Sequence, residues 1–275
     1  MSRNHEPPER RVVIVGGGFA GAYCAAKLGK LTRHLDVEIC LLDRNNFFVF
    51  TPLLIEAGVG DIEPRHAIVP IRRFLRDTRF VMGDVHDVDF AARQVHYRVS
   101  GTDDEGRLDY DHLVLATGAV TNLPDIPGLK ERSYQMKSIA DAVALRDRAI
   151  AMLERAEATG DAEARRRLLH FVIVGANFTG SELAGVYHQY LHEATRRYPS
   201  LTGDDCRVTL VDIDERILPA VDEDLADYAA EQLAGRGIKL RLETSVERCG
   251  SGEVELTNGE TIAAETLVWC AGIAP

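Results

Sequence analysis

Two glycine-rich turns carry the residues best suited to chemistry. The first, VVIVGGGFAG at 12–21, places Gly16, Gly18 and Gly21 in a G-x-G-x-x-G pattern after an apolar run and before a helical one. The first glycine permits a tight turn, the second lets a pyrophosphate approach the backbone, and the third lets the helix pack on the strand. The helix N-terminus then offers free N–H groups to phosphates. The pattern predicts a dinucleotide site.

An acidic residue accompanies this turn. Asp43 closes the apolar run 37–43, where its carboxylate can accept hydrogen bonds from a ribose. Strand, helix and terminal acid together make the prediction much stronger than the glycines alone.

The second turn, FVIVGANFTG at 171–180, offers Gly175, Asn177 and Gly180. Asparagine tolerates left-handed backbone better than most residues, so the turn can persist while the dinucleotide approaches less freely. On this steric reading, Asn177→Gly tightens dinucleotide binding or leaves it unchanged. If the amide binds the phosphate or holds the turn, the same change weakens binding. We favour the steric reading because the second glycine serves close approach.

The strand-end acid of the second unit is Asp212, after the run 207–212. Its carboxylate would bind a ribose 2′-hydroxyl and repel a 2′-phosphate, which favours NADH over NADPH. Arg207 and Arg216 lie close in sequence and weaken that choice. The alternative is an acid that only caps the next turn.

The order of elements supports two α/β units. Strand, helix and strand patterns occupy 11–15, 19–31 and 37–43, and the order restarts with 168–174, 179–197, 207–212 and 223–235. Alternating segments at 79–88 and 94–99 predict an antiparallel insertion. We expect two Rossmann-like domains, residues 1–125 and residues 168–275; the family resemblance described below implies that the first is incomplete at its C-terminal end. Residues 126–167 would form a linker and connecting helix that begins at Ser138, with 155–167 as a solvated bend.

Composition limits the function classes. The chain has 275 residues, 45% hydrophobic and 27% charged, as in ordinary globular proteins, and a net charge of −11. Nucleic acid is an improbable partner because it requires a basic footprint. The longest uncharged stretch is too short to span a bilayer, and no secretory signal opens the chain. We therefore expect a cytoplasmic or membrane-peripheral location.

The five cysteines, Cys24, Cys40, Cys206, Cys249 and Cys270, form neither a C-x-x-C pair nor a metal-binding pattern with histidine. We expect no metal site, and we expect Cys24 and Cys40 to be buried, inert thiols.

Several blocks in succession resemble one family. VVIVGGGFAG, DRNNFFVFTPLL, YDHLVLATGA, MKSIADAVALRDRA, FVIVGANFTGSELAG and TLVWCAGIAP resemble the FAD-dependent pyridine nucleotide oxidoreductases, and most closely the type II NADH:quinone oxidoreductases. The resemblance covers nearly the whole chain in order. It implies bound FAD, NADH as hydride donor and a quinone as acceptor.

The resemblance also implies roles for individual residues. FAD would lie on the first turn, with Thr51, Pro52 and Leu53 near the isoalloxazine and Val85 beside the adenine. NADH would lie on the second turn, with Ala271 and Gly272 approaching the nicotinamide. The full set of cofactor-binding residues expected for FAD is Gly16, Gly18, Phe19, Ala20, Gly21, Asp43, Arg44, Thr51, Pro52, Leu53, Val85, Ala116, Thr117 and Gly118. For NADH it is Gly175, Asn177, Phe178, Thr179, Gly180, Asp212, Ala271 and Gly272.

Glu182 is the one candidate catalytic residue. The resemblance places it where nicotinamide meets flavin; the alternative is a capping box, Thr179-x-x-Glu182, that serves the helix start. Hydride transfer needs no side-chain acid or base, because the flavin carries the chemistry.

The family continues beyond the A-G-I-A-P block into a segment that completes the flavin site and carries the quinone and membrane-binding regions. We therefore expect membrane association, on the inner face, only through a region that this sequence does not contain. Three classes remain open: an FAD-dependent NADH dehydrogenase, a soluble flavoprotein reductase for a small iron-sulfur protein, and an inactive nucleotide-binding fragment.

Overall fold

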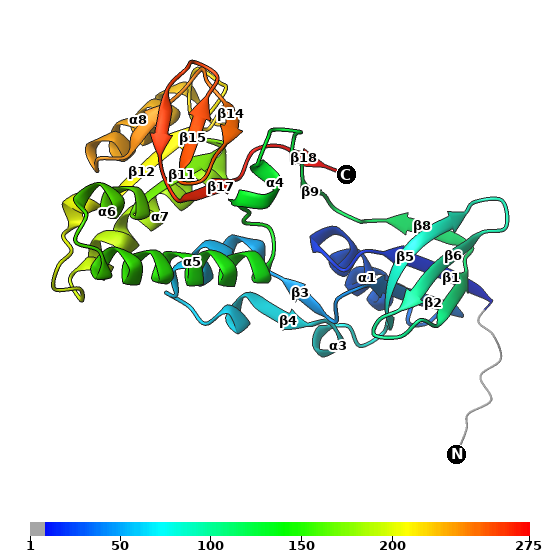
Figure 1. The fold of residues 1–275 in the computed structure, drawn as a ribbon. Helices are drawn as coiled ribbons and strands as arrows, with labels where there is room; N and C mark the ends of the chain where they lie inside the picture. Colours follow the sequence, from blue (N-terminus) through cyan, green and yellow to red (C-terminus); the bar gives the residue numbers. More distant parts are fainter. Residues whose placement is uncertain (1–8) are drawn as a thin grey trace. The chain divides into compact units, whose positions relative to one another are not determined.

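The computed structural model describes residues 9–275 and divides them into two units. The first unit contains the described residues up to Phe50 and the stretch Ile68–Ala119, with Pro275. The second contains Thr51–Ala67 and Val120–Ala274. Each unit is built around its own sheet (Figure 1).

The first unit is a six-stranded sheet in the order β7-β6-β5-β2-β1-β8. Strands β5, β2, β1 and β8 run parallel, with Ile14 of β1 opposite Leu41 and Val114, whereas β6 and β7 are antiparallel additions to β5. The elements of this unit are β1 (Arg10–Val15), α1 (Phe19–Thr32), β2 (Val37–Asp43), β3 (Phe47–Val49), β4 (Ile68–Pro70), α3 (Ile71–Phe74), β5 (Arg79–Asp89), β6 (Gln94–Val99), β7 (Glu105–Asp109) and β8 (His112–Leu115).

Strands β1 and β2 are apolar at 12–15 and 39–42, because both faces of the sheet are covered there. Ile14 and Ile39 lie in the core beneath α1 with Ala22 and Ala25. Their neighbours in the chain point the other way and pack on β6 and β7, in a cluster of Val13, Val15, Cys40, Leu42, Val95, Tyr97 and Leu108. The antiparallel strands thus take the place of a second layer of helices.

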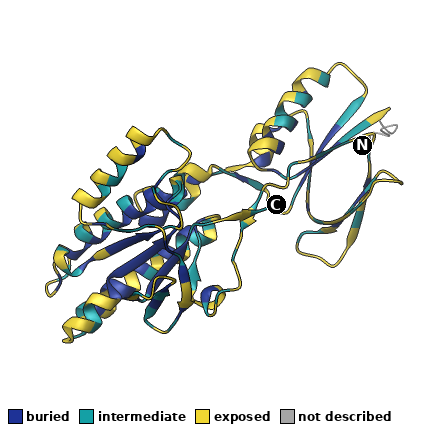
Figure 2. Ribbon diagram, turned by 90° about the horizontal axis from the view of Figure 1, so that it is seen from above, coloured by how far each residue is buried: buried dark blue, intermediate teal, exposed yellow. Residues whose placement is uncertain are grey.

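The second unit has a five-stranded parallel sheet in the order β10-β17-β11-β12-β13. Figure 2 shows how thoroughly its central strands are buried, whereas the outward turns of the helices are exposed. The sheet and its helices are β10 (Ser133–Tyr134), α5 (Ile139–Ala158), α6 (Ala162–Leu168), β11 (His170–Val174), α7 (Phe178–Thr195), β12 (Arg207–Val211), α8 (Glu223–Gly235), β13 (Lys239–Arg241) and β17 (Thr266–Trp269). The remaining elements are η1 (Thr51–Leu53), α2 (Leu54–Val59), η2 (Pro64–Ala67), β9 (Val120–Thr121), α4 (Leu129–Arg132), η3 (Gly203–Asp205), β14 (Val246–Cys249), β15 (Glu253–Leu256), β16 (Thr261–Ala263) and β18 (Ile273–Ala274).

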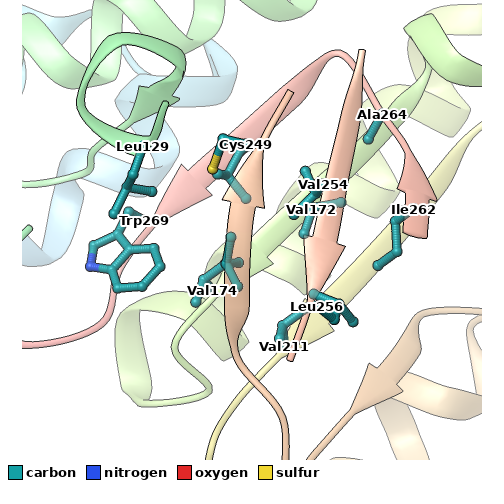
Figure 3. Close-up of a cluster of buried hydrophobic side chains, with 12 residues drawn as sticks. Leu129, Val172, Val174, Val211, Cys249, Val254, Leu256, Ile262, Ala264 and Trp269 are labelled. Carbon is teal, nitrogen blue, oxygen red and sulfur yellow. The ribbon is translucent and has the colours of Figure 1, made fainter. Parts of the chain in front are cut away.

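A small antiparallel sheet, β14-β15-β16, covers one face of this parallel sheet. Figure 3 shows the shared core, in which Val172 and Val174 of β11 meet Val254 and Leu256 of β15. Trp269, the only tryptophan, packs there beside Leu129 and donates its indole N–H to the carbonyl of Asn122 at 3.1 Å.

The two units share one plan. In each, a first strand is flanked by the second and third strands on one side and by a later parallel strand on the other, and antiparallel strands are inserted before that later strand. The prediction of two Rossmann-like parallel sheets, each with an antiparallel insertion, is confirmed.

The segment Thr51–Ala67 belongs to the second unit, although we expected it within residues 1–125. Its helix α2 contacts α5 and α7, and the buried Tyr187 hydroxyl of α7 donates to the carbonyl of Gly58 at 2.8 Å. Gly58 also packs against Met136. Apolar packing onto helices that come later in the chain therefore decides where this segment lies.

The stretch 126–167 is also more than a linker. Tyr134 of β10 pairs with Val268 of β17, so the stretch adds a strand to the second sheet. The predicted capping box at Ser138 and Asp141 is present at the start of α5. The expected bend at 155–167 is wrong. Helix α5 continues to Ala158, and a second helix, α6, begins at Ala162 with the Asp161 side chain as its N-cap.

No helix of residues 9–275 combines the length and apolar character needed to cross a membrane.

His170 joins the strands of the second unit and gives it a pH dependence. Its ring nitrogens lie 2.8 Å from the Thr209 hydroxyl and 3.0 Å from the Ala263 carbonyl, and burial lowers its pKa to about 4. An unfolded histidine binds its proton near pH 6.5, so the unfolded state gains protons first as pH falls. Stability should therefore be full above pH 6.5 and fall by up to about 3 kcal/mol towards pH 4.

Urea unfolding followed by Trp269 fluorescence reports on the second unit and checks this. His170→Gln should flatten the pH dependence between pH 6.5 and 4, whereas His34→Gln, at an exposed histidine of the first unit, should leave it unchanged. Equal pH dependence in parent and His170→Gln would contradict the assignment.

Candidate nucleotide-binding sites

The first glycine turn lies at the carboxyl end of β1, where α1 begins. Gly16 has a φ of 104°, and a Cβ at Gly21 would overlap the carbonyl oxygen of Gly16. A Cβ at Gly18, by contrast, would meet no atom within 4 Å. Gly16 and Gly21 therefore shape the turn, whereas Gly18 leaves its outer side open, as the approach of a pyrophosphate requires.

Asp43 supports this turn from the end of β2. Its carboxylate accepts hydrogen bonds from the backbone N–H of Gly17 at 2.5 Å and of Asn45 at 2.7 Å. Each carboxylate oxygen can accept a further bond, so ribose binding remains open to this half-buried side chain.

The other residues predicted for the first site are spread over several elements, and Thr51, Pro52 and Leu53 form η1 of the second unit. Phe19 and Ala20 form the exposed first turn of α1, with Arg44 just after β2. Ala116, Thr117 and Gly118 follow β8, and the carbonyl of Ala116 lies against Gly16. These residues share the carboxyl edge of the sheet. Val85 instead lies within β5 and is half-buried with the core beneath β6 and β7.

The second turn repeats the first almost bond for bond. Gly175 has a φ of 101°, and a Cβ at Gly180 would overlap the Gly175 carbonyl. Asp212, like Asp43, accepts from two backbone N–H groups, those of Ala176 and of Asp214. The first glycine of each turn donates its N–H to the carbonyl of the residue just before the acid: Gly16 to Leu42 and Gly175 to Val211, both at 2.8 Å.

Asn177 differs from Gly18 in its side chain and not in its backbone. Gly18 has φ −73° and ψ −166°, and Asn177 has φ −74° and ψ −173°, so the position needs no left-handed backbone. The Asn177 amide accepts from the N–H of Gly180 at 3.2 Å and donates to the carbonyl of Cys270 at 2.9 Å. The amide therefore caps α7 and ties it to the end of β17.

This geometry corrects the steric reading of Asn177. The side chain is turned towards the protein and holds the turn, which was the less favoured alternative.

Glu182 lies one turn into α7 and is exposed. Partial burial, and secondarily the charge of Glu56, raise the pKa of its carboxyl group. The alternative role in a capping box is wrong, because α7 begins at Phe178 and its N-cap is Asn177, which leaves Thr179 inside the helix.

A cavity of about 280 Å³ brings together residues predicted for both cofactors. It lies within the second unit, between η1, α2 and the start of α7, and Glu182 is one of the residues that line it. Its lining consists of Thr51, Pro52, Leu54, Ile55, Met136, Lys137, Phe178, Thr179 and Glu182. A neighbouring cavity of about 220 Å³ is lined by Thr121, Met136, Lys137, Asn177, Phe178, Thr179, Trp269, Cys270, Gly272 and Ile273.

These cavities include residues that the sequence patterns missed. Met136 and Lys137 line both cavities, and Leu54 and Ile55 line the larger one. The block MKSIADAV contains the signal, because Ser138 is the predicted start of a helix and the two residues before it must lie at the helix N-terminus. Ala271, predicted for the nicotinamide, lies against Gly175.

The cysteines offer no redox pair. All five are free thiols, and burial raises the pKa of Cys40 to about 11 and that of Cys270 to about 12. Cys24 is only half-buried. No cluster of three or more His, Cys, Asp or Glu side chains suited to a metal ion occurs in the part of the chain that the structure describes.

Comparison with known proteins places this pair of turns in a family. The family model described as "Pyridine nucleotide-disulphide oxidoreductase" matches residues 10–275. The chain belongs to this family.

Named relatives narrow the likeness to one group within the family. The chain is 34% identical over 279 residues to the type II NADH:quinone oxidoreductase Ndh of Mycobacterium tuberculosis, covering 98% of this chain and 59% of that protein. It is 31% identical over 280 residues to the external alternative NAD(P)H-ubiquinone oxidoreductase B3 of Arabidopsis thaliana, covering 96% and 47%. The chain thus spans about half the length of the curated relatives it matches.

A solved structure of NDH2 from Plasmodium falciparum in complex with NADH has the same fold. The TM-score is 0.87 at 22% identity, over 97% of this chain and 55% of that one.

The two hydrogen bonds of the Asn177 amide should contribute to the stability of the folded protein. Asn177→Gly removes the cap on α7 and the bond to Cys270, which should cost about 1 kcal/mol and speed amide exchange at Gly180. Hydrogen exchange, with urea unfolding followed by Trp269, measures both effects. Unchanged exchange at Gly180 would contradict the bridging role.

Proposed function

We propose that this chain forms the dinucleotide-binding part of an FAD-dependent NADH dehydrogenase, which passes a hydride from NADH to FAD and then electrons to a quinone-like acceptor. One observation carries the proposal: the second turn repeats the first in its glycines, backbone angles, strand-end carboxylate and hydrogen bonds. Two such turns suit one nucleotide held as a prosthetic group and another that arrives as hydride donor. The names of the relatives support the same reaction.

FAD would be held by the first turn. The fit rests on the open outer side of Gly18, the N-terminus of α1 with Phe19 and Ala20, and the remaining acceptor capacity of Asp43. The backbone of 116–118, with Gly118 at φ 71° and open space around it, allows a flat ring to approach closely. FAD, when bound, supplies a ring that accepts a hydride and releases electrons to an acceptor.

NADH would be held by the second turn, with its adenosine ribose at Asp212 and its pyrophosphate at 177–179. The nicotinamide half would then cross the end of β17 at 271–272 and enter the cavities lined by Phe178 and Thr179. Thr51 and Pro52 line the same cavity and would meet the flavin side of the reaction. Glu182 would border the nicotinamide.

The side chains of this site bind and orient the substrate and exclude water; none needs to give or take a proton for hydride transfer. The five cysteines are free thiols, and the raised pKa values of Cys40 and Cys270 further support an acceptor other than a disulfide of this chain. A quinone agrees with the names of the relatives. We further propose that the whole protein acts in the cytoplasm and associates peripherally with the inner face of the membrane.

The purified protein tests the reaction directly. A flavin absorption band near 450 nm that NADH bleaches under anaerobic conditions supports the proposal, and reoxidation by a soluble quinone identifies the acceptor class. Reoxidation only by a small iron-sulfur protein would favour a soluble reductase. A purified chain that lacks the flavin band would be an inactive nucleotide-binding fragment.

Gly18 provides a sharp test of FAD binding. Gly18→Val should fold, because a Cβ at this position meets no atom within 4 Å, yet it should lose most of its FAD because the side chain fills the pyrophosphate path. The ratio of absorbance at 450 nm to that at 280 nm measures FAD content. Gly160→Val is the matched control, since Gly160 also has open space around it and lies between α5 and α6. Full FAD content in Gly18→Val would reject the first turn as the FAD site.

Asp212 should make the chain prefer NADH. Arg207 lies at the amino end of β12, roughly 16 Å of strand away from Asp212, and Arg216 lies 3.9 Å from the Glu223 carboxylate, which offsets part of its charge. Repulsion of a 2′-phosphate by about 1 to 3 kcal/mol gives roughly five- to hundredfold selectivity. Flavin reduction rates at low NADH and NADPH concentrations measure it. Comparable rates would refute the role of Asp212.

Asn177 should also affect NADH binding at the second turn. Because its amide holds the turn, Asn177→Gly should raise the NADH dissociation constant and not lower it.

A further inference from the structure

The two cavities beside the second turn adjoin one another. They share four lining residues: Met136, Lys137, Phe178 and Thr179. The smaller cavity lies at the carboxyl end of β17, and the larger one lies between the start of α7 and α2 and includes Glu182. The exposed Lys137 is therefore among the residues at which the two cavities adjoin.

Two charged side chains, Lys137 and Glu182, line the larger cavity, and a third, Glu56, lies near Glu182 without lining it. Glu56 lies on α2 beside Ile55, which also lines the cavity. One oxygen of Glu56, Oε2, is buried without a hydrogen-bond partner among the described residues, and the charge of Glu56 acts on Glu182. Lys137 is the only cation of the lining, and its ammonium forms no ion pair in residues 9–275.

The two forms of the substrate differ in charge at this place. The nicotinamide ring is neutral in NADH and carries one positive charge in NAD⁺, while the rest of the molecule is the same. Two carboxylates attract the oxidised ring and an ammonium repels it, and neither acts strongly on the neutral ring. Charges around the cavity therefore change the affinity for product separately from the affinity for substrate.

We propose that Lys137 opposes Glu56 and Glu182 in setting the relative affinity of this cavity for oxidised and reduced nicotinamide, so that Lys137 promotes release of NAD⁺. This inference rests on the proposed NADH site. Without Lys137, the carboxylates would hold the positively charged product more tightly in the cavity. With it, the net charge beside the ring falls from two negative charges to one.

Calorimetry on the oxidised, flavin-loaded protein tests this without turnover. NAD⁺ supplies the charged ring, and 1,4,5,6-tetrahydro-NAD supplies a neutral ring that cannot donate a hydride. The measured quantity is the dissociation constant of the neutral ligand divided by that of NAD⁺. Lys137→Met should raise this ratio roughly three- to tenfold, as expected for one charge removed at a separation of several ångströms in a partly solvated site.

Two further variants make the test specific. Glu56→Gln should lower the ratio by a similar factor, because it removes an attractive charge. Lys130→Met, at an exposed lysine of α4 outside both cavities, should leave the ratio unchanged.

The outcomes separate this inference from the proposed function. If Lys137→Met weakens both ligands equally, Lys137 binds the shared pyrophosphate and the inference is overturned while the NADH site stands. An unchanged ratio in both Lys137→Met and Glu56→Gln also overturns it. If the parent binds neither ligand, the proposed NADH site fails, and the inference fails with it.

Discussion

Each glycine turn depends on a close backbone contact that leaves no room for a side chain. The third glycine of each pattern lies so close to the carbonyl of the first that a Cβ would overlap it, at Gly21 in one unit and at Gly180 in the other. This approach brings the N-terminus of the following helix over the carboxyl end of the first strand. The strand-end acid can then accept a backbone N–H from the turn, Gly17 for Asp43 and Ala176 for Asp212. The position of every proposed phosphate and ribose contact follows from this single steric constraint.

How far the sequence predicts such a structure depends on the range of the interactions. The glycine turns, the strand-end acids and the Ser138 capping box depend on neighbours within a few residues and could be read directly. The apolar runs 12–15 and 171–174 predicted the strands β1 and β11. These features cover most of the fold and the centres of both candidate sites.

Features decided by distant partners could not be read in the same way. The Asn177 amide bonds to the Cys270 carbonyl, which lies far away in sequence, so only the structure shows that the side chain turns inwards. The placement of Thr51–Ala67 depends on α5 and α7, which follow much later. Lys137 lines two cavities whose other residues come from segments far apart in the sequence, so its place in the candidate site is evident only in the structure. The helix α6 was missed because its charged sequence lacks an apolar stripe, and the Asp161 cap supplies the missing signal.

The segment Thr51–Ala67 belongs to the second unit, although the residues on either side of it belong to the first, and this affects the order in which the chain can fold. The strands on either side of it, β3 and β4, pair with each other in the first unit, while α2 within it packs on helices of the second. During synthesis from the N-terminus, α2 emerges long before α5 and α7, so its apolar side chains must wait for their partners. Closing the β3–β4 pair meanwhile confines an unanchored loop, at an entropy cost that grows only slowly with loop length. The first sheet can therefore assemble early, and the burial of Leu54, Ile55 and Val59 becomes a late step, completed when the Tyr187 hydroxyl reaches Gly58.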